Sequence, residues 1–206
     1  MLSSFIHAYL KIFFVLTPFF VTSTFVAMTS DYGEEKRKKT AIKITIAVLI
    51  SSFIIYMFGQ YIFALFGITL DAFRIGAGAL LFLSALQLVE GSPTSRQKQP
   101  KTADEDQDIA VVPLAIPITV GPGVIGMLMV MAAELPSTSD RLLVSGALLC
   151  AVATVGGLLY VSGGIERLIG NKGLTILTKL TGLFVSAIAA QLIFTGLRNF
   201  LILPLN

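Results

Sequence analysis

The stretch Val112-Pro-Leu-Ala-Ile-Pro-Ile-Thr-Val-Gly-Pro-Gly123 places three prolines and two glycines within eleven residues of an otherwise apolar run. Each proline removes a backbone donor and clashes with the carbonyl four residues earlier, so the stretch cannot form a regular helix. The run that contains it, residues 110–134, is nevertheless long enough to cross a bilayer. A break at membrane depth survives only where it is buried in protein or lines a watery cavity. We therefore expect a broken membrane-spanning helix whose freed backbone groups can bind a ligand.

The rest of the chain has the composition of a membrane protein. Of its 206 residues, 55% are hydrophobic and only 13% are charged, whereas a soluble domain carries about a quarter charged residues. Backbone groups must be paired in lipid, so the apolar runs are expected to be helices. Besides 110–134, these runs are 5–28, 41–66, 70–90, 142–163 and 174–203. The sequence predicts an all-α membrane protein with six transmembrane helices.

The distribution of Lys and Arg predicts the orientation in the bilayer. Eleven of the 15 basic residues lie in or beside the first, third and fifth connections: Lys36, Arg37, Lys38, Lys39, Lys43, Arg96, Lys98, Lys101, Arg167, Lys172 and Lys179. Basic loops stay in the cytoplasm, so both termini are expected outside it. The net charge of +3 is too small to suggest a nucleic-acid partner.

A weak internal repeat relates the two halves of the chain. Five residues recur 104 positions later: Tyr56, Gly59, Leu70, Gly78 and Gln87 match Tyr160, Gly163, Leu174, Gly182 and Gln191. In the first and fourth spans, Pro18 is matched with Pro117 at an offset of 99. Three spans per half make the second half inverted, an arrangement typical of secondary transporters. The predicted units are 1–90, a flexible cytoplasmic linker at 91–109, and 110–206.

Candidate binding residues lie at the two broken spans. The first span contains Leu16-Thr-Pro-Phe-Phe-Val-Thr-Ser-Thr24, with hydroxyl groups after a central proline. Amides at a half-helix N-terminus favour a carboxylate or another anionic group. The expected site consists of Thr17, Pro18, Thr22, Ser23, Pro117, Thr119, Gly121, Pro122 and Gly123, with Gln87 and Gln191 as supporting donors.

Ionisable residues are scarce within the apolar runs. Asp71 and Arg74 share one helical face at the start of the third span. They either gate or couple a transport pathway, or form an interfacial pair that caps the helix. The chain has no Walker loop, complete dinucleotide fingerprint or His-Glu-x-x-His pattern, so neither enzymatic activity, a metal site nor a cofactor is expected. Coupling to Na+ or H+ is left open.

Three strings carry a resemblance to a known family: Val111-Val-Pro-Leu-Ala-Ile-Pro-Ile-Thr-Val-Gly-Pro-Gly-Val-Ile125, Phe66-Gly-Ile-Thr-Leu-Asp-Ala-Phe-Arg-Ile-Gly-Ala-Gly78, and the tail from Leu180 to Gly196. They resemble the MarC family of bacterial and archaeal inner-membrane proteins. The resemblance implies six spans in inverted halves and a prokaryotic cytoplasmic membrane. It also implies, for some members, transport of glycine or alanine. Many relatives carry Asn and a Pro-x-Gly-x-x-Pro pattern where this chain has Thr17, Phe20 and Ser23.

These observations together predict a secondary transporter of a small, largely neutral solute, such as a small neutral amino acid. One half would rock against the other around a site formed by the two broken spans. Two other functions stay open: a non-transporting membrane scaffold or regulatory protein, and a drug or metabolite exporter with a large apolar cavity. The sequence also leaves open whether the chain forms a homo-oligomer.

Overall fold

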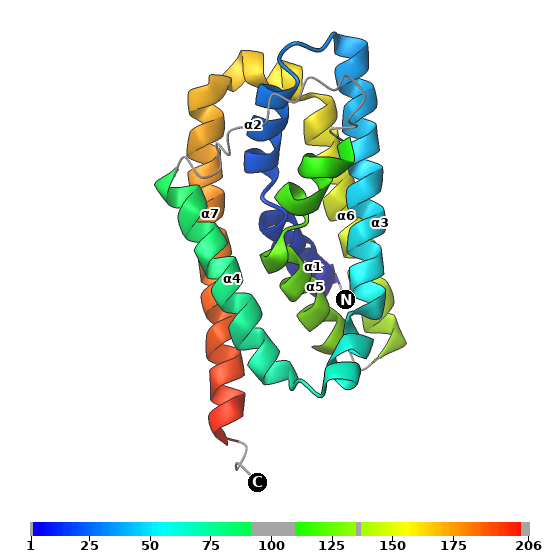
Figure 1. The fold of residues 1–206 in the computed structure, drawn as a ribbon, viewed down its shortest axis with the longest axis vertical. Helices are drawn as coiled ribbons and strands as arrows, with labels where there is room; N and C mark the ends of the chain where they lie inside the picture. Colours follow the sequence, from blue (N-terminus) through cyan, green and yellow to red (C-terminus); the bar gives the residue numbers. More distant parts are fainter. Residues whose placement is uncertain (1, 92–109, 135–136, 203–206) are drawn as a thin grey trace.

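The computed structural model describes residues 2–91, 110–134 and 137–202, and its regular structure in these ranges is entirely helical (Figure 1). The expected linker at 91–109 therefore lies, apart from Gly91, outside the described residues. The helices are α1 (Leu2–Val15), α2 (Pro18–Met28), α3 (Glu34–Phe66), α4 (Leu70–Glu90), η2 (Ala110–Thr119), α5 (Pro122–Glu134), α6 (Thr138–Tyr160) and α7 (Ser162–Ile202).

Five helical segments of the described chain are long and apolar enough to cross a membrane: Leu2–Met28, Glu34–Gly59, Leu70–Glu90, Thr138–Tyr160 and Ser162–Leu201. The run expected as the fourth span is divided into η2, a π-helix of 10 residues, and α5, an apolar helix of 13 residues. Neither piece alone reaches the length of about 20 residues that a span needs. The all-helical membrane architecture is confirmed, with the fourth apolar run present as two short helices.

Two connections that were expected to be loops are largely helical. Helix α3 begins at Glu34, seven residues before the apolar run expected at 41–66. An ion pair of 2.6 Å between Lys38 and Glu34, four residues apart, supports its first turns. The connection expected between the runs 142–163 and 174–203 belongs to α7, in which only Gly170 has a non-helical conformation (φ 64°, ψ 176°). The prediction of loops at these positions is wrong because helical hydrogen bonds also form in the polar ends of the spans.

The broken helices lie between two pairs of long helices. In Figure 1, α4 and α7 run antiparallel along one side, α3 and α6 lie on the other, and α1, α2, η2 and α5 fill the space between them. Helix α1 packs against α6, η2 against α3, α2 against α7, and α5 against α4. Fully buried apolar side chains from this central layer include Leu16, Phe25, Leu114 and Leu128. Large apolar side chains on the outer faces of α3 and α7, such as Ile50 and Phe194, are exposed, as expected of a surface in contact with lipid.

Helices α4 and α7 cross through two reciprocal glycine contacts. A side-chain carbon at Gly78 would lie 3.0 Å from the carbonyl oxygen of Ala189, and one at Gly182 would lie 3.0 Å from the carbonyl oxygen of Ala85. Gly78 and Gly182 are 104 positions apart in the sequence, and so are Ala85 and Ala189. Small residues let membrane helices approach this closely. The repeat detected in the sequence is therefore also present in the packing of these two helices.

Candidate functional site

The first helix break lies between α1 and α2. Thr17 has a left-handed backbone conformation (φ 48°, ψ 56°) and is the only residue other than glycine with a positive φ in the described ranges. The following Pro18 disfavours helical geometry at Thr17, which explains the position of the break. A left-handed conformation costs an L-residue about 1–2 kcal/mol. Backbone strain of this kind is concentrated at functional sites.

The second break lies between η2 and α5. The Val120 amide donates to the carbonyl oxygen of Ala115, five residues earlier, at 2.9 Å. The Thr119 hydroxyl donates in the same direction to the carbonyl oxygen of Leu114 at 2.7 Å. Because proline cannot donate a backbone hydrogen bond, this wider winding accommodates the Pro-rich stretch up to the start of α5 at Pro122.

The two breaks share the same hydrogen-bond register. Pro18 and Pro122 each occupy the first position of a helix, where a missing amide costs nothing. The Val21 amide donates to the Thr17 carbonyl oxygen at 3.0 Å, and the Ile125 amide donates to the Gly121 carbonyl oxygen at 3.0 Å. Each residue again has its counterpart 104 positions later. The match of Pro18 with Pro117 is therefore wrong: Pro117 lies inside η2, and Pro122 is the structural counterpart of Pro18.

Each break leaves backbone amides open at a helix N-terminus. The first amides of an α-helix have no partner within the helix. In α2 these belong to Phe19 and Phe20, and the Thr17 side chain caps neither. In α5 they belong to Gly123 and Val124. The two N-termini also carry the positive ends of the helix dipoles, so each favours an anionic group.

Both N-termini open on one cavity of about 260 Å³. Eight of its lining residues form four pairs separated by 104 positions: Val15 with Thr119, Thr17 with Gly121, Phe20 with Val124, and Leu81 with Val185. The remaining lining residues are Ser84, Gln87, Leu88, Ile118, Pro122 and Gly123. None of the lining side chains is charged. The cavity therefore lies between equivalent parts of the two halves and offers polar groups without net charge.

The structure brings six of the predicted site residues to this cavity: Thr17, Gln87, Thr119, Gly121, Pro122 and Gly123. Pro18 and Thr22 are buried beside it, and the Thr22 hydroxyl donates to the Pro18 carbonyl oxygen at 2.7 Å. Ser23 is half-buried and lies outside the lining. The side chain of Pro117 is outside the described part of the chain.

Gln87 and Gln191 were both expected as supporting donors of the site, but only Gln87 lines the cavity. Both side chains are exposed, and Gln191 lies on α7 outside the lining. Sequence reasoning also missed Leu81, Ser84 and Leu88, which line the cavity from α4. Their spacing of three and four residues marks one face of a helix, and this spacing could have identified them around Gln87.

Helices α4 and α5 close one side of the cavity. A side-chain carbon at Gly123 would lie 3.0 Å from the Cα atom of Leu81, and one at Gly126 would lie 3.2 Å from the Cα atom of Ala77. The cavity lining continues from Leu81 in the opposite direction along α4, through Ser84 to Leu88. The closed side therefore faces the start of α4, and the cavity extends toward the end of α4.

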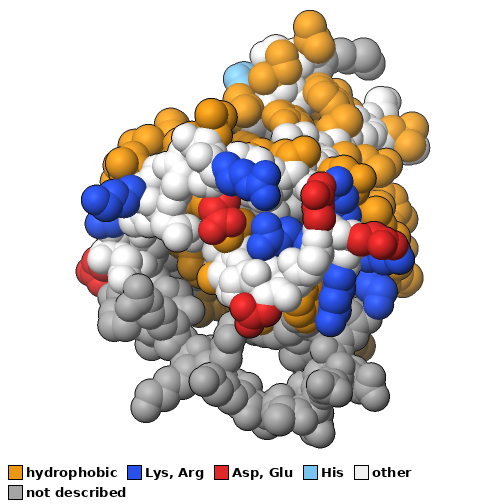
Figure 2. Space-filling model, turned by 90° about the horizontal axis from the view of Figure 1, so that it is seen from above, with side chains coloured by type: hydrophobic (Ala, Val, Ile, Leu, Met, Phe, Trp, Pro, Cys, Tyr) orange, Lys and Arg blue, Asp and Glu red, His pale blue; other side chains and the backbone are white. Residues whose placement is uncertain are grey.

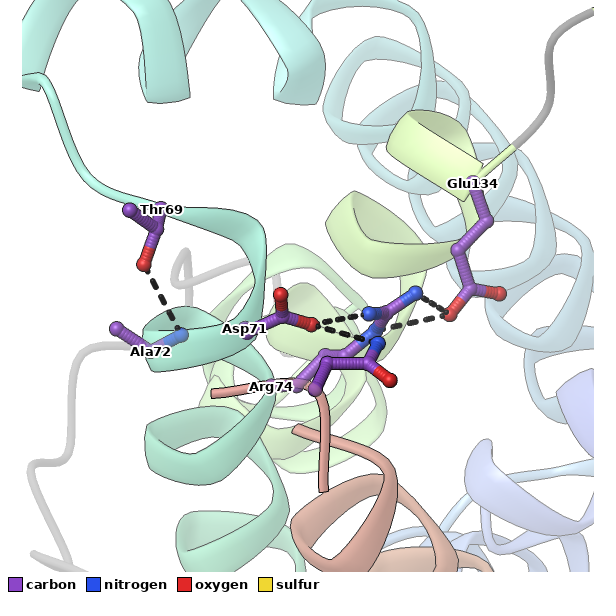
Figure 3. Close-up of polar contacts among 6 residues, drawn as sticks. Thr69, Asp71, Ala72, Arg74 and Glu134 are labelled. Carbon is purple, nitrogen blue, oxygen red and sulfur yellow. Dashed lines mark hydrogen bonds and ion pairs between the residues drawn. The ribbon is translucent and has the colours of Figure 1, made fainter. Parts of the chain in front are cut away.

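Beyond this closed side, a polar network joins α4, α5 and α7 (Figure 3). The Arg74 side chain, 9% exposed, pairs with Asp71. Its Nε and Nη2 atoms donate to Oε1 of Glu134 at 3.1 and 2.8 Å. The Asn199 side-chain amide donates to Oδ1 of Asp71 at 3.1 Å. Asp71 and Arg74 thus pair with each other outside the cavity. No local sequence pattern indicated their further partners, Glu134 and Asn199.

Long apolar helices with two breaks around a shared cavity are typical of an integral membrane protein with a candidate solute site. The chain belongs to the MarC family, because the model for the MarC family integral membrane protein matches residues 2–201. It is 38% identical to the UPF0056 membrane protein MJ1677 of Methanocaldococcus jannaschii over 98% of this chain and 99% of the relative. It is 28% identical to the UPF0056 membrane protein YhcE of Escherichia coli over 93% and 90% of the two chains. No solved structure matches the chain.

Proposed function

We propose that the chain is a secondary transporter of a small neutral amino acid such as glycine or alanine. The observation that carries this proposal is the opening of two helix N-termini, at Pro18 and Pro122, on the same cavity. Half-helix N-termini that point at the carboxylate of a substrate are a recurring feature of secondary transporters.

The chemistry of the cavity fits a zwitterion. The open amides of Phe20, Gly123 and Val124 favour a carboxylate. Carbonyl groups at the ends of α1 and η2 that are left without a partner in the helix and the hydroxyl oxygens of Thr17 and Thr119 can accept hydrogen bonds from an ammonium group. Without a charged side chain in the lining, a solute with a net charge would enter the cavity uncompensated. A solute carrying one charge of each sign satisfies both kinds of backbone group.

The size of the cavity favours a small solute over a drug. Pockets for drug-sized ligands enclose about 300–1,000 Å³, and this cavity has about 260 Å³. The volume lies just below this range, so transport of a small amino acid is favoured over drug export.

Alternating access would follow from a six-span inverted repeat in which η2 and α5 together form the fourth span. The reciprocal contacts of Gly78 and Gly182 support this arrangement. The packing of the helices supports it as well. In the repeat, η2 and α5 correspond to α1 and α2, while α6 and α7 correspond to α3 and α4. The α1–α6 contact is accordingly repeated as η2–α3, and the α2–α7 contact as α5–α4. Each half would therefore provide one broken span and one long helix at the central crossing.

The conformation described here corresponds, in this proposal, to access from the cytoplasm. Figure 2 shows Lys and Arg side chains gathered at the upper end of the molecule, with acidic side chains among them. The positive-inside rule assigns this end to the cytoplasm, with both termini outside it. The cavity extends along α4 toward this end, while the contacts of Gly123 and Gly126 and the Arg74–Glu134 pair close the other.

The proposal is tested with purified protein in liposomes, by counterflow of radiolabelled glycine and alanine. Thr119→Val should lower uptake about fivefold, because it removes a cavity hydroxyl that also donates to Leu114, and one hydrogen bond is worth about 1 kcal/mol. Ser23→Ala, outside the lining, is the matched control and should transport normally. If no amino acid is taken up or binds to the wild-type protein, the alternative of a scaffold or regulatory protein replaces transport.

A further inference from the structure

A second cavity, of about 490 Å³, lies at the charged end of the molecule, between the start of α3 and the junction of α6 and α7. Its lining residues are Tyr32, Glu34, Arg37, Lys38, Tyr160, Val161, Gly163, Gly164 and Arg167. None of them lines the central cavity. The second cavity is therefore a separate feature, built by residues of both halves of the chain.

The side chains of this cavity carry an excess of positive charge. Three are cationic and one, Glu34, is acidic. Glu34 is already paired with Lys38 at 2.6 Å. Arg37 Nη1 lies 4.0 Å from a carboxylate oxygen of Glu166, beyond hydrogen-bond distance. The three cations exceed the two nearby carboxylates, Glu34 and Glu166, by one positive charge, so the cavity is complementary to an anion.

Two buried polar atoms beside the cavity lack a hydrogen-bond partner. The Arg37 side chain is only 18% exposed, and although its Nη2 donates to the Thr29 carbonyl oxygen at 3.0 Å, its Nε has no partner. The hydroxyl of Ser162, at the start of α7, is also buried without one. Unpaired buried polar groups are rare in folded proteins, so the Arg37 side chain keeps a hydrogen-bond donor that its protein neighbours do not use.

Apolar surface adjoins the positive charge. Val161 in the lining is exposed, and Leu168, on the next turns of α7, is 85% exposed. The segment from Ser162 to Ile169 precedes the break at Gly170 and runs across the top of the molecule in Figure 1. Tyr160 and Tyr32 add the aromatic side chains that are typical of a membrane interface. A ligand here would meet cations at one end and lipid-like surface at the other.

We propose that this cavity binds the headgroup of an anionic phospholipid, with the phosphate between Arg37 and Arg167 and the acyl chains along Val161 and Leu168. Basic pockets between membrane helices on the cytoplasmic side bind such headgroups, and guanidinium groups match the geometry of phosphate oxygens. Arg37 belongs to the first half and Arg167 to the second. The bound lipid connects the two halves at their cytoplasmic end.

The experiment compares thermal unfolding of the detergent-purified protein with added short-chain phosphatidylglycerol, phosphatidylcholine of the same chain length, and inorganic phosphate. A ligand that binds the folded state raises the melting temperature in a concentration-dependent way. The expected result is a saturable rise with phosphatidylglycerol alone. Arg167→Gln should weaken the apparent affinity about fivefold, since one basic residue near a membrane surface contributes about a factor of this size.

Lys172→Gln is the matched control, because Lys172 is an exposed cation of α7 outside the cavity. It removes the same charge and should leave the affinity unchanged. Arg37→Gln also removes the hydrogen bond to Thr29 and can therefore destabilise the fold. If the Arg37→Gln variant does not fold, Arg167→Gln alone tests the lipid site. Equal shifts with both phospholipids, an equal shift with inorganic phosphate, or equal weakening by Lys172→Gln would each overturn the lipid site.

Discussion

Gln87 lines the central cavity, whereas Gln191, its counterpart 104 positions later in the sequence, does not, although both side chains are exposed. Leu88 also lines the cavity and its counterpart Leu192 does not, although both are buried. Residues that are equivalent by sequence thus have different surroundings in one conformation. In the proposed transport cycle the two halves exchange conformations, so Gln191 would enter the cavity as Gln87 leaves it.

Cysteine labelling tests this exchange of Gln87 and Gln191. The exposed Cys150 is first replaced by Ser. In this background, Gln87→Cys should react with a membrane-impermeant thiol reagent added from the cytoplasmic side, and Gln191→Cys should react only from the opposite side. Conditions that trap one state should increase labelling at one position and decrease it at the other. Labelling of both positions from the same side, in parallel under all conditions, would exclude the exchange.

Replacement of Thr17 by Asn should stabilise the protein. Thr17 has a left-handed conformation with φ 48°, which asparagine tolerates better than a β-branched residue. The free energy of unfolding should rise by about 1 kcal/mol. Thr24→Asn, within helix α2, is the control and should have little effect because the two residues have similar helix propensities. Chemical denaturation in detergent measures both; equal changes for the two variants would contradict strain at Thr17.

The crossing of α4 and α7 should not tolerate a side chain at Gly78 or Gly182. Each substitution to Ala would bring a carbon to 3.0 Å from a backbone oxygen of the other helix. Overpacking of this kind costs about 1–3 kcal/mol, so both variants should unfold at lower temperature. Gly76→Ala is the matched control on α4: no atom lies within 4 Å of the added carbon, and Ala favours helix by about 1 kcal/mol. A Gly76→Ala variant as unstable as the other two would refute the packing argument.

Glu134→Gln should weaken closure of the outer end of the cavity. Its carboxylate binds Arg74, but the Glu134 side chain is 41% exposed, so the loss is expected to be about 1 kcal/mol. A change of this size shifts a two-state equilibrium about fivefold. The readout is a cysteine introduced at the buried Ala77 in the background that lacks Cys150. Glu134→Gln should raise its rate of reaction with a thiol reagent added from the outer side about fivefold. Asp140→Asn, an exposed carboxylate beyond α5, is the control and should leave the reactivity unchanged.

The sequence by itself determined most of the helical segments and showed that the first and fourth apolar runs are broken. The third apolar run coincides with α4 at Leu70–Glu90, and Pro18 and Pro122 begin α2 and α5. These features are local: each span must pair its own backbone groups in lipid, and proline fixes where a helix can begin. Five of the six predicted site residues that line the cavity lie at these breaks, and the sixth, Gln87, lies within α4.

Tertiary structure alone decided which residues meet. Arg74 binds Glu134, 60 positions away, and Asp71 accepts from Asn199, 128 positions away; no local pattern connects them. Tertiary structure also decided that η2 incorporates Pro117, so that the second break falls at Pro122. It left Gln191 outside the cavity that Gln87 lines. The physical reason is that helix formation in lipid is satisfied within a segment, whereas contacts between segments depend on how the helices pack and on the conformation of the two halves.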